Sequence, residues 1–467
     1  MTVSGHGEKS NVNKNYVNKS DKTGLVFFPA FDWAITPTHP EREERLLYTR
    51  DQIFEEGIMD LPGIREYKPR LAAYKDIART HFCVPGVKDQ VTEAHLISAG
   101  GTLVMADALM AGEIRNGFAM VRPPGHHAMK VVHGNRGFCN INNEAIMVDY
   151  LRSNYGIRKI AVVDTDVHHG DGTQDIFYHD PDILFISFHQ DGRTLFPGSG
   201  FSNEAGGPAA YGRNLNIPLP PGTTDEGIHY VLDNLILPVL QEFEPELVIN
   251  SAGQDNHYTD PLANMKFTTQ GYARLNEKLK PDIAVLEGGY AIETALPYLN
   301  TGIILAMAGM DYSNVVEPDY KPGMLTMSQE KMTRVTELVE EARFVWDNRN
   351  SREIEVMRAK KDFFQRQKQI FYDTDGINEY QVEKLRLCAD CGGYLSIASQ
   401  AFPYHGAEKN ILALSVPFNG CSRCREEAYG EYDQGKKKKI YEYVYFQDRV
   451  SDTCLGWSRA NNTEWEE

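Results

Sequence analysis

Short runs of apolar residues that end abruptly in polar residues recur along this chain. Many are rich in β-branched residues, a pattern typical of buried strands in a parallel sheet. Between them, residues 94–111 show apolar positions at helical spacing, and another helix is expected from residue 143. Repeated strand, polar loop and helix predict an α/β fold with helices on both faces of a mostly parallel sheet. The expected strands are residues 25–28, 118–121, 160–163, 183–189, 214–219, 247–252 and 283–287.

Two charged segments favour helices. One helix is expected to begin near Glu41, after two prolines, and Arg42, Arg45 and the acids between them are interpreted as its solvated face. Residues 327–387 are charged and helix-favouring, and we predict two helices there with a break near residues 348–351. A late strand is expected at residues 441–446. The chain is thus divided into a flexible N-terminus (1–23), a large α/β domain (24–326), a helical extension (327–387) and a small C-terminal domain (388–467).

The run at residues 160–163 leads into five ionisable side chains within eight residues. Polar residues behind a buried parallel strand lie where open α/β sheets bind ligands. Side chains alternate along a strand, so Asp164, Asp166 and His168 can project to one side. An Asp and a His two residues apart can chelate a borderline metal such as zinc. The sequence therefore predicts a metal site here rather than a solvated acidic loop.

Other strand ends supply the remaining groups of a hydrolytic site. His126 and His127 follow one strand, and Asp164 and Asp171 are spare carboxylates that can back them as two His–Asp dyads. Asp255 follows another strand and completes an Asp–His–Asp metal set with room for water. Tyr290, after two glycines, can donate a hydrogen bond to a developing oxyanion. Each residue alone has an ordinary structural interpretation, but together they indicate metal-assisted amide hydrolysis.

Composition and charge narrow the classes of function further. The 467 residues are 42% hydrophobic and 24% charged, and the formal net charge is −17. This charge disfavours nucleic acid and is compatible with cationic substrates. No apolar run is long enough to span a membrane, and the polar N-terminus does not fit a signal peptide, so a cytoplasmic location is expected. The seven cysteines are expected to be reduced thiols or metal ligands.

Five ordered motifs resemble the zinc-dependent histone deacetylase family, which shares the arginase-like α/β fold and includes acetylpolyamine amidohydrolases. The motifs are RPPGHHA (122–128), GFCNINN (137–143), DTDVHHGDG (164–172), FPGSG (196–200) and the segment from SAGQDN to LEGGY (251–290). The resemblance implies an arginase/deacetylase-like three-layer α/β/α domain and hydrolysis of an N-acetyl or other N-acyl amide. The implied substrate is acetyl-lysine in a protein, an acetylpolyamine or another small acetylamine.

The resemblance also implies a role for each matching residue. His127 with Asp171 is the expected general base and acid, His126 with Asp164 the electrostatic partner, and Tyr290 the carbonyl polariser. Gly137 offers a backbone carbonyl, and Phe138 and Phe196 form the walls of a narrow tunnel. The catalytic zinc ligands are Asp166, His168 and Asp255, and a potassium ion is expected at Asp164, Asp166, His168, Ser187 and Phe188.

Three positions depart from the family pattern. Gln254 and Ile141 stand where phenylalanine is usual, and both are expected to reshape the pocket. Leu262 follows the Asp-Pro pair where polyamine-specific eukaryotic relatives carry glutamate. Because His257 replaces the second acid of an Asp-x-Asp pair, a two-metal ureohydrolase is disfavoured. The alternatives left open are a non-catalytic acyl-lysine binding protein, and iron(II) in place of zinc.

Two CxxC pairs mark a second metal site outside the deacetylase-like region. Paired thiolates at this spacing suit a tetrahedral structural zinc, and CADCGG resembles a zinc-ribbon knuckle. Structural zinc is favoured over bystander thiols or redox chemistry. The region is expected to recruit a protein partner, to mediate self-association or to dock on the α/β domain. The four cysteines are Cys388, Cys391, Cys421 and Cys424.

Overall fold

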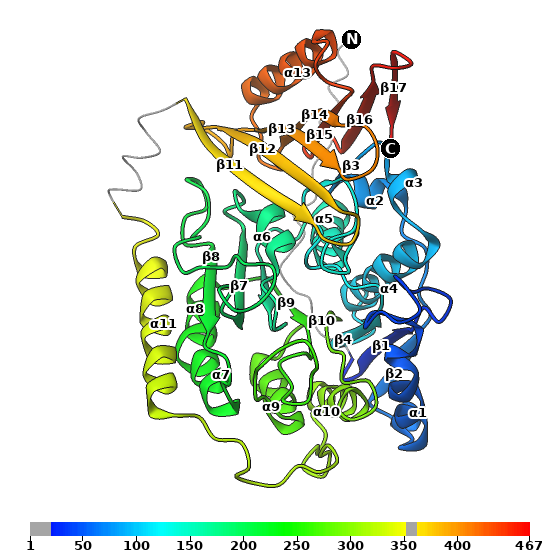
Figure 1. The fold of residues 1–467 in the computed structure, drawn as a ribbon, viewed down its shortest axis with the longest axis vertical. Helices are drawn as coiled ribbons and strands as arrows, with labels where there is room; N and C mark the ends of the chain where they lie inside the picture. Colours follow the sequence, from blue (N-terminus) through cyan, green and yellow to red (C-terminus); the bar gives the residue numbers. More distant parts are fainter. Residues whose placement is uncertain (1–19, 352–361) are drawn as a thin grey trace, which may run out of the picture.

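A parallel sheet of eight strands forms the centre of the larger domain (Figure 1). The computed structural model describes residues 20–351 and 362–467. Of the N-terminus expected to be flexible (1–23), residues 1–19 lie outside the described part. The strand order is β2-β1-β4-β10-β9-β6-β7-β8, and every neighbouring pair is parallel. The strands are β1 (Thr23–Phe28), β2 (Ile64–Tyr67), β4 (Asn116–Val121), β6 (Ile160–Asp164), β7 (Ile183–Gln190), β8 (Asn214–Leu219), β9 (Leu247–Ala252) and β10 (Ile283–Leu286).

Both faces of this sheet are covered by helices, because alternate side chains of each strand point to opposite sides. On β4, Phe118 and Met120 join one apolar core, whereas Ala119 and Val121 join the other. The expected three-layer α/β/α architecture is confirmed. The first core includes α1 (Leu47–Glu55), α7 (Asp225–Val231), α8 (Leu237–Phe243), α9 (Thr269–Leu279), α10 (Leu296–Ala308) and α11 (Gln329–Asp347); the second includes α2 (Tyr74–Ala78), α3 (Val87–Gln90), α4 (Glu93–Met110), α5 (Asn143–Tyr155) and α6 (Asp171–Phe177).

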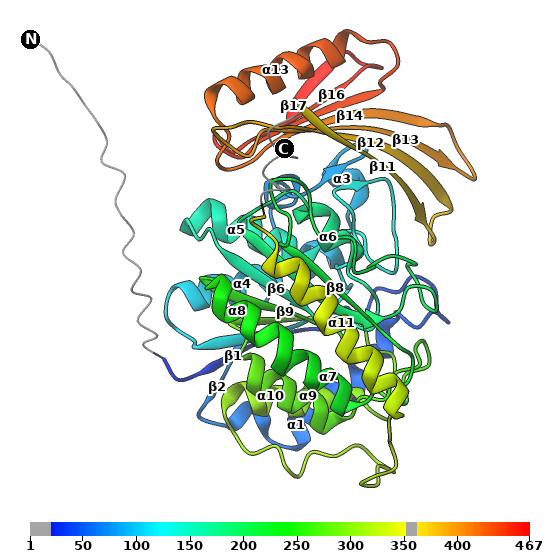
Figure 2. The same ribbon diagram turned by 90° about the vertical axis from the view of Figure 1, so that its left-hand side faces the viewer.

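The C-terminal part is a second sheet, which lies across the top of the larger domain in Figures 1 and 2. Its seven strands follow chain order, and only β14 and β15 pair in parallel, across the connecting helix α13 (Ser422–Lys437). The helix covers one face, and the other face packs on the larger domain. The strands are β11 (Phe363–Tyr372), β12 (Ile377–Arg386), β13 (Leu395–Pro403), β14 (Lys409–Val416), β15 (Tyr443–Asp448), β16 (Thr453–Ser458) and β17 (Thr463–Glu466).

This sheet corrects two boundaries expected from the sequence. The second predicted helix is wrong over residues 363–371, which form β11, and its first residues lie outside the described part. The C-terminal domain therefore begins at Phe363 rather than at residue 388, and it is larger than a zinc ribbon. In β11, Arg366 and Lys368 face inward with Ile370 and pair with buried acids. Because charged residues occupy inward positions, the sequence does not show the apolar–polar alternation typical of a strand. The first predicted helix is present as α11 and packs its apolar side on the α/β core.

The turn between β11 and β12 reaches a loop of the larger domain that follows β5 (Val131–Val132), the partner of β3 (Phe82–Cys83). Tyr372 donates its hydroxyl to the carbonyl of Val131 (2.9 Å), and His133 Nε2 lies 2.9 Å from Ser399 Oγ. The backbone N–H of Asn135 donates to Asp375 (2.6 Å). Alternate residues from Val131 in β5 to Asn135 in this loop are thus held by the C-terminal sheet.

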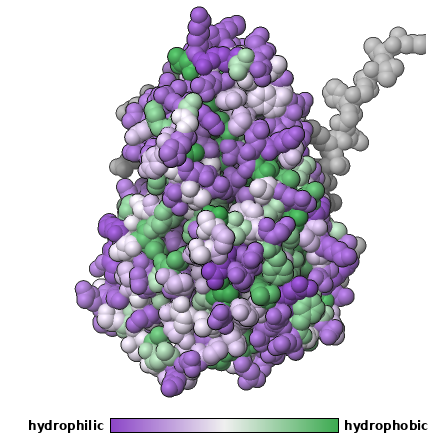
Figure 3. All heavy atoms as spheres, turned by 45° about the vertical axis from the view of Figure 1, so that its right-hand side comes forward, coloured by the Kyte–Doolittle hydropathy of each residue, from purple (hydrophilic) through white to green (hydrophobic). Residues whose placement is uncertain are grey.

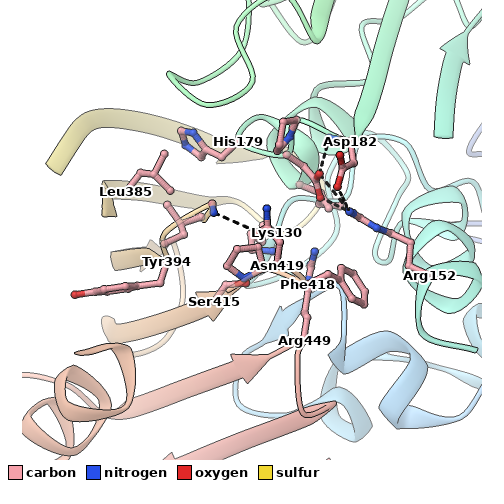
Figure 4. A pocket seen from close by; sticks show the side chains of 16 residues that line it. Lys130, Arg152, His179, Asp182, Leu385, Tyr394, Ser415, Phe418, Asn419 and Arg449 are labelled. Atoms are coloured by element: carbon pink, nitrogen blue, oxygen red, sulfur yellow. Dashed lines mark hydrogen bonds and ion pairs between the residues drawn. The ribbon is translucent and has the colours of Figure 1, made fainter. Parts of the chain in front are cut away.

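Elsewhere the interface between the domains is charged. Phe418 inserts between the guanidinium groups of Arg152 and Arg449, whose Cζ atoms lie 4.5 and 5.6 Å from its ring centroid (Figure 4). Arg449 also pairs with the buried Asp149 (3.1 Å). Lys130 lines the same small cavity, and its burial lowers its pKa to about 7. The C-terminal sheet is therefore docked by polar as well as apolar contacts, one of the three roles expected for this region.

The outer surface is mixed. In Figure 3 the C-terminal domain, at the top, is mostly hydrophilic, and apolar side chains lower down gather in small separate patches. Among the described residues, no helix is both long and apolar enough to cross a membrane.

Candidate active site

The loops that carry the predicted chemistry follow four neighbouring strands. In the order β4-β10-β9-β6, these strands lead to His126 and His127, to Tyr290, to Asp255, and to Asp166 and His168. Because parallel strands end at one edge of the sheet, residues far apart in sequence meet there. Each of these side chains is at least mostly buried.

Three of them converge as a metal-binding group would require. One potential ligand atom from each of Asp166, His168 and Asp255 lies within 4.8 Å of the other two. His168 Nδ1 is 3.1 Å from a carboxylate oxygen of each aspartate. Two fully buried carboxylates this close repel each other, and a protonated imidazole or a metal ion between them would offset that repulsion. Two carboxylates and one imidazole suit zinc or iron(II).

Glycines make room for these carboxylates. A Cβ at Gly253 would lie 2.1 Å from Asp166 Oδ2, and one at Gly288 would lie 2.1 Å from Asp255 Oδ2. The backbone N–H of Gly288 donates to Asp166 Oδ2 (2.7 Å), and that of Val167 donates to Asp255 Oδ1 (2.9 Å). The ligand set is therefore oriented by the backbone around it, as a metal site needs.

The two histidines each have a carboxylate behind the ring. His126 Nδ1 lies 3.0 Å from Asp164 Oδ2, and His127 Nδ1 lies 2.8 Å from Asp171 Oδ1. The second oxygen of Asp171 pairs with Arg136 at 2.7 Å. The structure thus brings together both dyads that were expected from the sequence.

The two imidazoles differ in charge. For His127, burial and the nearby His126, His168 and Arg136 hold its pKa well below the usual value, so its ring is neutral at neutral pH. Burial also disfavours the charged form of His126, but Asp166 and Asp164 outweigh it and raise the pKa of His126 to about 9. The neutral ring of His127 can accept a proton, as a general base must, and the charged ring of His126 can stabilise nearby negative charge.

Tyr290 is 7% exposed, and its burial raises its pKa well above the usual value, so the phenol stays protonated and can donate. Its loop is held by Arg45, which the sequence analysis wrongly assigned to a solvated helix face. Arg45 Nε donates to the carbonyl of Gly289 (2.8 Å), a second nitrogen donates to the carbonyl of Glu287, and the guanidinium lies 4.9 Å from the Tyr290 ring centroid.

Arg45 is fully buried because Glu41 is buried beside it. Glu41 accepts from Arg45 (2.8 Å) and from Arg122 (2.6 Å), and these guanidinium groups lower its pKa despite its burial. Arg122 belongs to the RPPGHHA motif, so one carboxylate ties the loops after β4 and β10 together. The spacing of Glu41 and Arg45 predicts a helical pair but does not reveal burial, so the sequence contained no signal for this role.

A cavity of ≈ 290 Å³ opens onto these groups. His127 meets the ring of Phe196 edge-on at 5.1 Å between centroids, and Phe138 meets Tyr290 at 5.6 Å. Gln254 and Ile141, expected to reshape the pocket, are not among its lining residues, and Gln254 donates to Asn300 (2.6 Å) instead. The lining residues are Pro124, His126, His127, Gly137, Phe138, Asp166, His168, Leu195, Phe196, Leu262, Gly288, Tyr290 and Asp373.

The other positions expected to hold potassium lie next to the expected metal ligands Asp166 and His168. Asp164 on β6 pairs in register with Ser187 on β7, and Phe188 follows it. Asp164, Asp166, Ser187 and Phe188 are fully buried. These residues are therefore contiguous with the metal group.

The four C-terminal cysteines also converge, with sulfur atoms within 4.8 Å of one another. Cys388 and Cys391 lie in the loop between β12 and β13, and Cys421 and Cys424 lie at the start of α13. Burial disfavours the Cys388 thiolate, but the Asp390 N–H and the Arg423 guanidinium outweigh it and lower its pKa to about 6. Four converging sulfurs at this CxxC spacing fit a tetrahedral zinc. Cys83, Cys139 and Cys454 are free thiols away from it.

Comparison with known proteins agrees with this geometry. Residues 83–307 match the model of the histone deacetylase domain. A "Probable deacetylase" of Archaeoglobus fulgidus is 44% identical over 332 residues, covering 65% of this chain and 91% of that protein. The "Polyamine deacetylase HDAC10" of Danio rerio is 35% identical over 266 residues, or 54% of this chain and 38% of that protein.

The fold has a solved counterpart. The crystal structure of the HDA15 HD domain superposes with a TM-score of 0.60 at 24% identity, covering 73% of this chain and 99% of that one, which shows a shared fold. The chain belongs to the histone deacetylase family. It is accordingly a hydrolase of a family whose enzymes depend on zinc.

Proposed function

We propose that this protein is a zinc-dependent deacetylase that hydrolyses the N-acetyl, or another N-acyl, amide of lysine or of a related primary amine. The observation that carries the proposal is the convergence of Asp166, His168 and Asp255 beside two His–Asp dyads and Tyr290 in one cavity. All the groups that amide hydrolysis needs are present, so catalysis is favoured over a protein that only binds acyl-lysine.

The residues divide the reaction among them. The alkyl chain of the substrate amine lies between Phe138 and Phe196, with the acyl amide at its inner end, and Tyr290 donates a hydrogen bond to the carbonyl oxygen as negative charge develops. Neutral His127 takes a proton from the attacking water, and Asp171 stabilises the imidazolium that forms. His127 then returns the proton to the leaving amine, which departs as the C–N bond breaks. His126, charged and backed by Asp164, stabilises the negative charge nearby.

Asp166, His168 and Asp255 would hold the zinc ion. Zinc bound there would polarise the carbonyl and acidify the attacking water. The residues Asp164, Asp166, His168, Ser187 and Phe188 are proposed to hold a potassium ion behind it.

The test is acetate release by the purified, zinc-loaded protein, offered an acetyl-lysine peptide and an acetylated polyamine in parallel. We expect turnover of at least one substrate, and Tyr290→Phe should lower kcat by about 10²–10³, as loss of an oxyanion donor does. The absence of turnover with metal bound at the Asp166 site would contradict the proposal and favour an acyl-lysine binding protein.

A further inference from the structure

The turn between β11 and β12 delivers a carboxylate to the mouth of the active-site cavity. Among the described residues of the C-terminal sheet domain, Asp373 is the one that lines this cavity, together with His127, Phe138 and Tyr290. It lies outside the histone deacetylase domain at residues 83–307. A second domain therefore completes the wall of the site.

The position of Asp373 is fixed from both sides. Its Oδ1 accepts a hydrogen bond from the backbone N–H of Gly137 (2.8 Å), and the preceding Tyr372 is buried with its hydroxyl bonded to Val131 and Glu379. Asp375, two residues on, accepts from both the backbone and the side chain of Asn135. A turn held at three points presents the carboxylate at a defined place on the rim.

The charge on Asp373 is left available. Its side chain is exposed, Gly137 uses one oxygen, and among the described residues the carboxylate forms no ion pair. Arg136, the positively charged residue next to Gly137 in the loop, pairs with Asp171. His39 packs on Phe138 near this carboxylate. Burial lowers the pKa of His39 more than the Asp373 charge raises it, so the imidazole is neutral. The rest of the rim, Leu195 and Leu262, is apolar.

We infer that Asp373 forms a subsite for a positively charged amine that the substrate carries beyond its acylated nitrogen. This inference rests on the proposed deacetylase function and assigns its substrate class, an N-acylated diamine or polyamine. The methylene chain lies between the Phe138 and Phe196 rings, and the free ammonium leaves the tunnel where the Asp373 carboxylate faces solvent. The net charge of −17 adds a long-range attraction for such a substrate.

The test compares two substrates of equal length. N-acetyl-1,4-diaminobutane carries the terminal ammonium, and N-pentylacetamide replaces it with a methyl group. Asp373→Asn keeps an oxygen for the Gly137 N–H but removes the charge. We expect it to raise KM for the diamine about 3- to 5-fold, the range for an exposed ion pair, and to leave N-pentylacetamide unaffected.

Asp375→Asn is the matched control. Asp375 lies in the same turn but does not line the cavity, and the asparagine keeps an oxygen that accepts from Asn135, so the turn stays in place. This variant should leave KM for both substrates unchanged. Affinity is also measured without turnover, by titrating N-acetyl-1,4-diaminobutane into Tyr290→Phe and into Tyr290→Phe with Asp373→Asn. The second protein should bind about 3- to 5-fold more weakly.

The possible failures are distinct. If the wild-type protein hydrolyses neither of these amides nor an acetyl-lysine peptide, the proposed function fails, while the titration still tests the subsite. The cation subsite is refuted if Asp373→Asn lowers kcat/KM equally for both substrates. It is also refuted if the substitution lowers kcat/KM for an acetyl-lysine peptide but not for the diamine. An equal loss for both substrates would mean that Asp373 only positions the Gly137 loop.

Discussion

Arg136 contributes, after burial, His126 and His168, to the lowered pKa of the proposed base, His127. It is buried, pairs with Asp171 at 2.7 Å and lies among the charges that lower the pKa of His127. A general base acts when deprotonated, so kcat/KM should fall only as the pH drops through a His127 pKa well below 6.5. The acid limb of the pH profile of kcat/KM therefore reports the pKa of His127.

Arg136→Gln should move that limb to higher pH. The substitution removes a positive charge near His127 and leaves Asp171 free to stabilise the imidazolium, and both effects raise the pKa of His127. The measurement is the pH dependence of kcat/KM between pH 5 and pH 8. Arg193→Gln is the control, because that side chain is 69% exposed and pairs with Asp191 at the surface. An acid limb that stays in place, or moves to lower pH, would exclude His127 as the base.

At the scale of elements, the short 3-10 helix Glu43–Leu46 and the loop after β10 form one unit through Arg45. Arg45→Met should lower the free energy of unfolding by about 3–5 kcal/mol, since it leaves the Glu41 carboxylate and two backbone carbonyls with fewer donors. It should also reduce turnover, because the loop that carries Tyr290 loses its support. Denaturant unfolding and steady-state kinetics check the two effects.

Arg42→Met is the matched control for that change. Arg42 lies three residues earlier and pairs with Glu44, but both side chains are partly exposed, at 35% and 46%. Its removal should alter the free energy of unfolding by less than about 0.5 kcal/mol. Equal losses in the two variants would mean that the buried Glu41–Arg45 pair does not hold the Tyr290 loop.

These elements also show what the sequence could and could not predict. Strands and helices of the parallel sheet were predictable, because apolar runs ending in ionisable residues have few other interpretations. Arg45 was misassigned because a charged i, i+4 pair looks the same whether it is buried or solvated. β11 was misassigned because Arg366 and Lys368 occupy inward positions that apolar residues usually fill. In both cases the deciding partners lie far away in sequence.

At the scale of the whole molecule, the C-terminal sheet forms part of the active site's surroundings. It holds alternate residues from Val131 to Gly137, and Gly137 and Phe138 adopt left-handed backbone conformations (φ +52° and +69°) directly after them. Glycine adopts this conformation readily, but Phe138 has a Cβ and keeps it only because the surrounding structure enforces it. The second domain therefore supports the tunnel wall as well as supplying Asp373, and its own integrity bears on the site.

The four cysteines provide the way to test that integrity. Together Cys388→Ser and Cys391→Ser should lower the bound zinc by one per chain, since serine is a poor ligand for the remaining thiolates. The melting temperature should also fall, because zinc would join the β12–β13 loop to the start of α13, where Cys424 is buried in the apolar core. Cys454→Ala is the control, because Cys454 is buried but lies outside the cluster.

Metal analysis of the pure protein, before and after the double substitution, decides this prediction. We expect two zinc ions per chain in the wild-type protein and one in the variant, the remaining ion being removed by Asp255→Asn. The hairpin contacts to Val131 and Asn135 are made at the end of the sheet that carries no cysteine. KM for N-acetyl-1,4-diaminobutane should therefore change less in the double cysteine variant than in Asp373→Asn. An unchanged zinc content would show that the four thiols bind no metal and that the sheet is held without one.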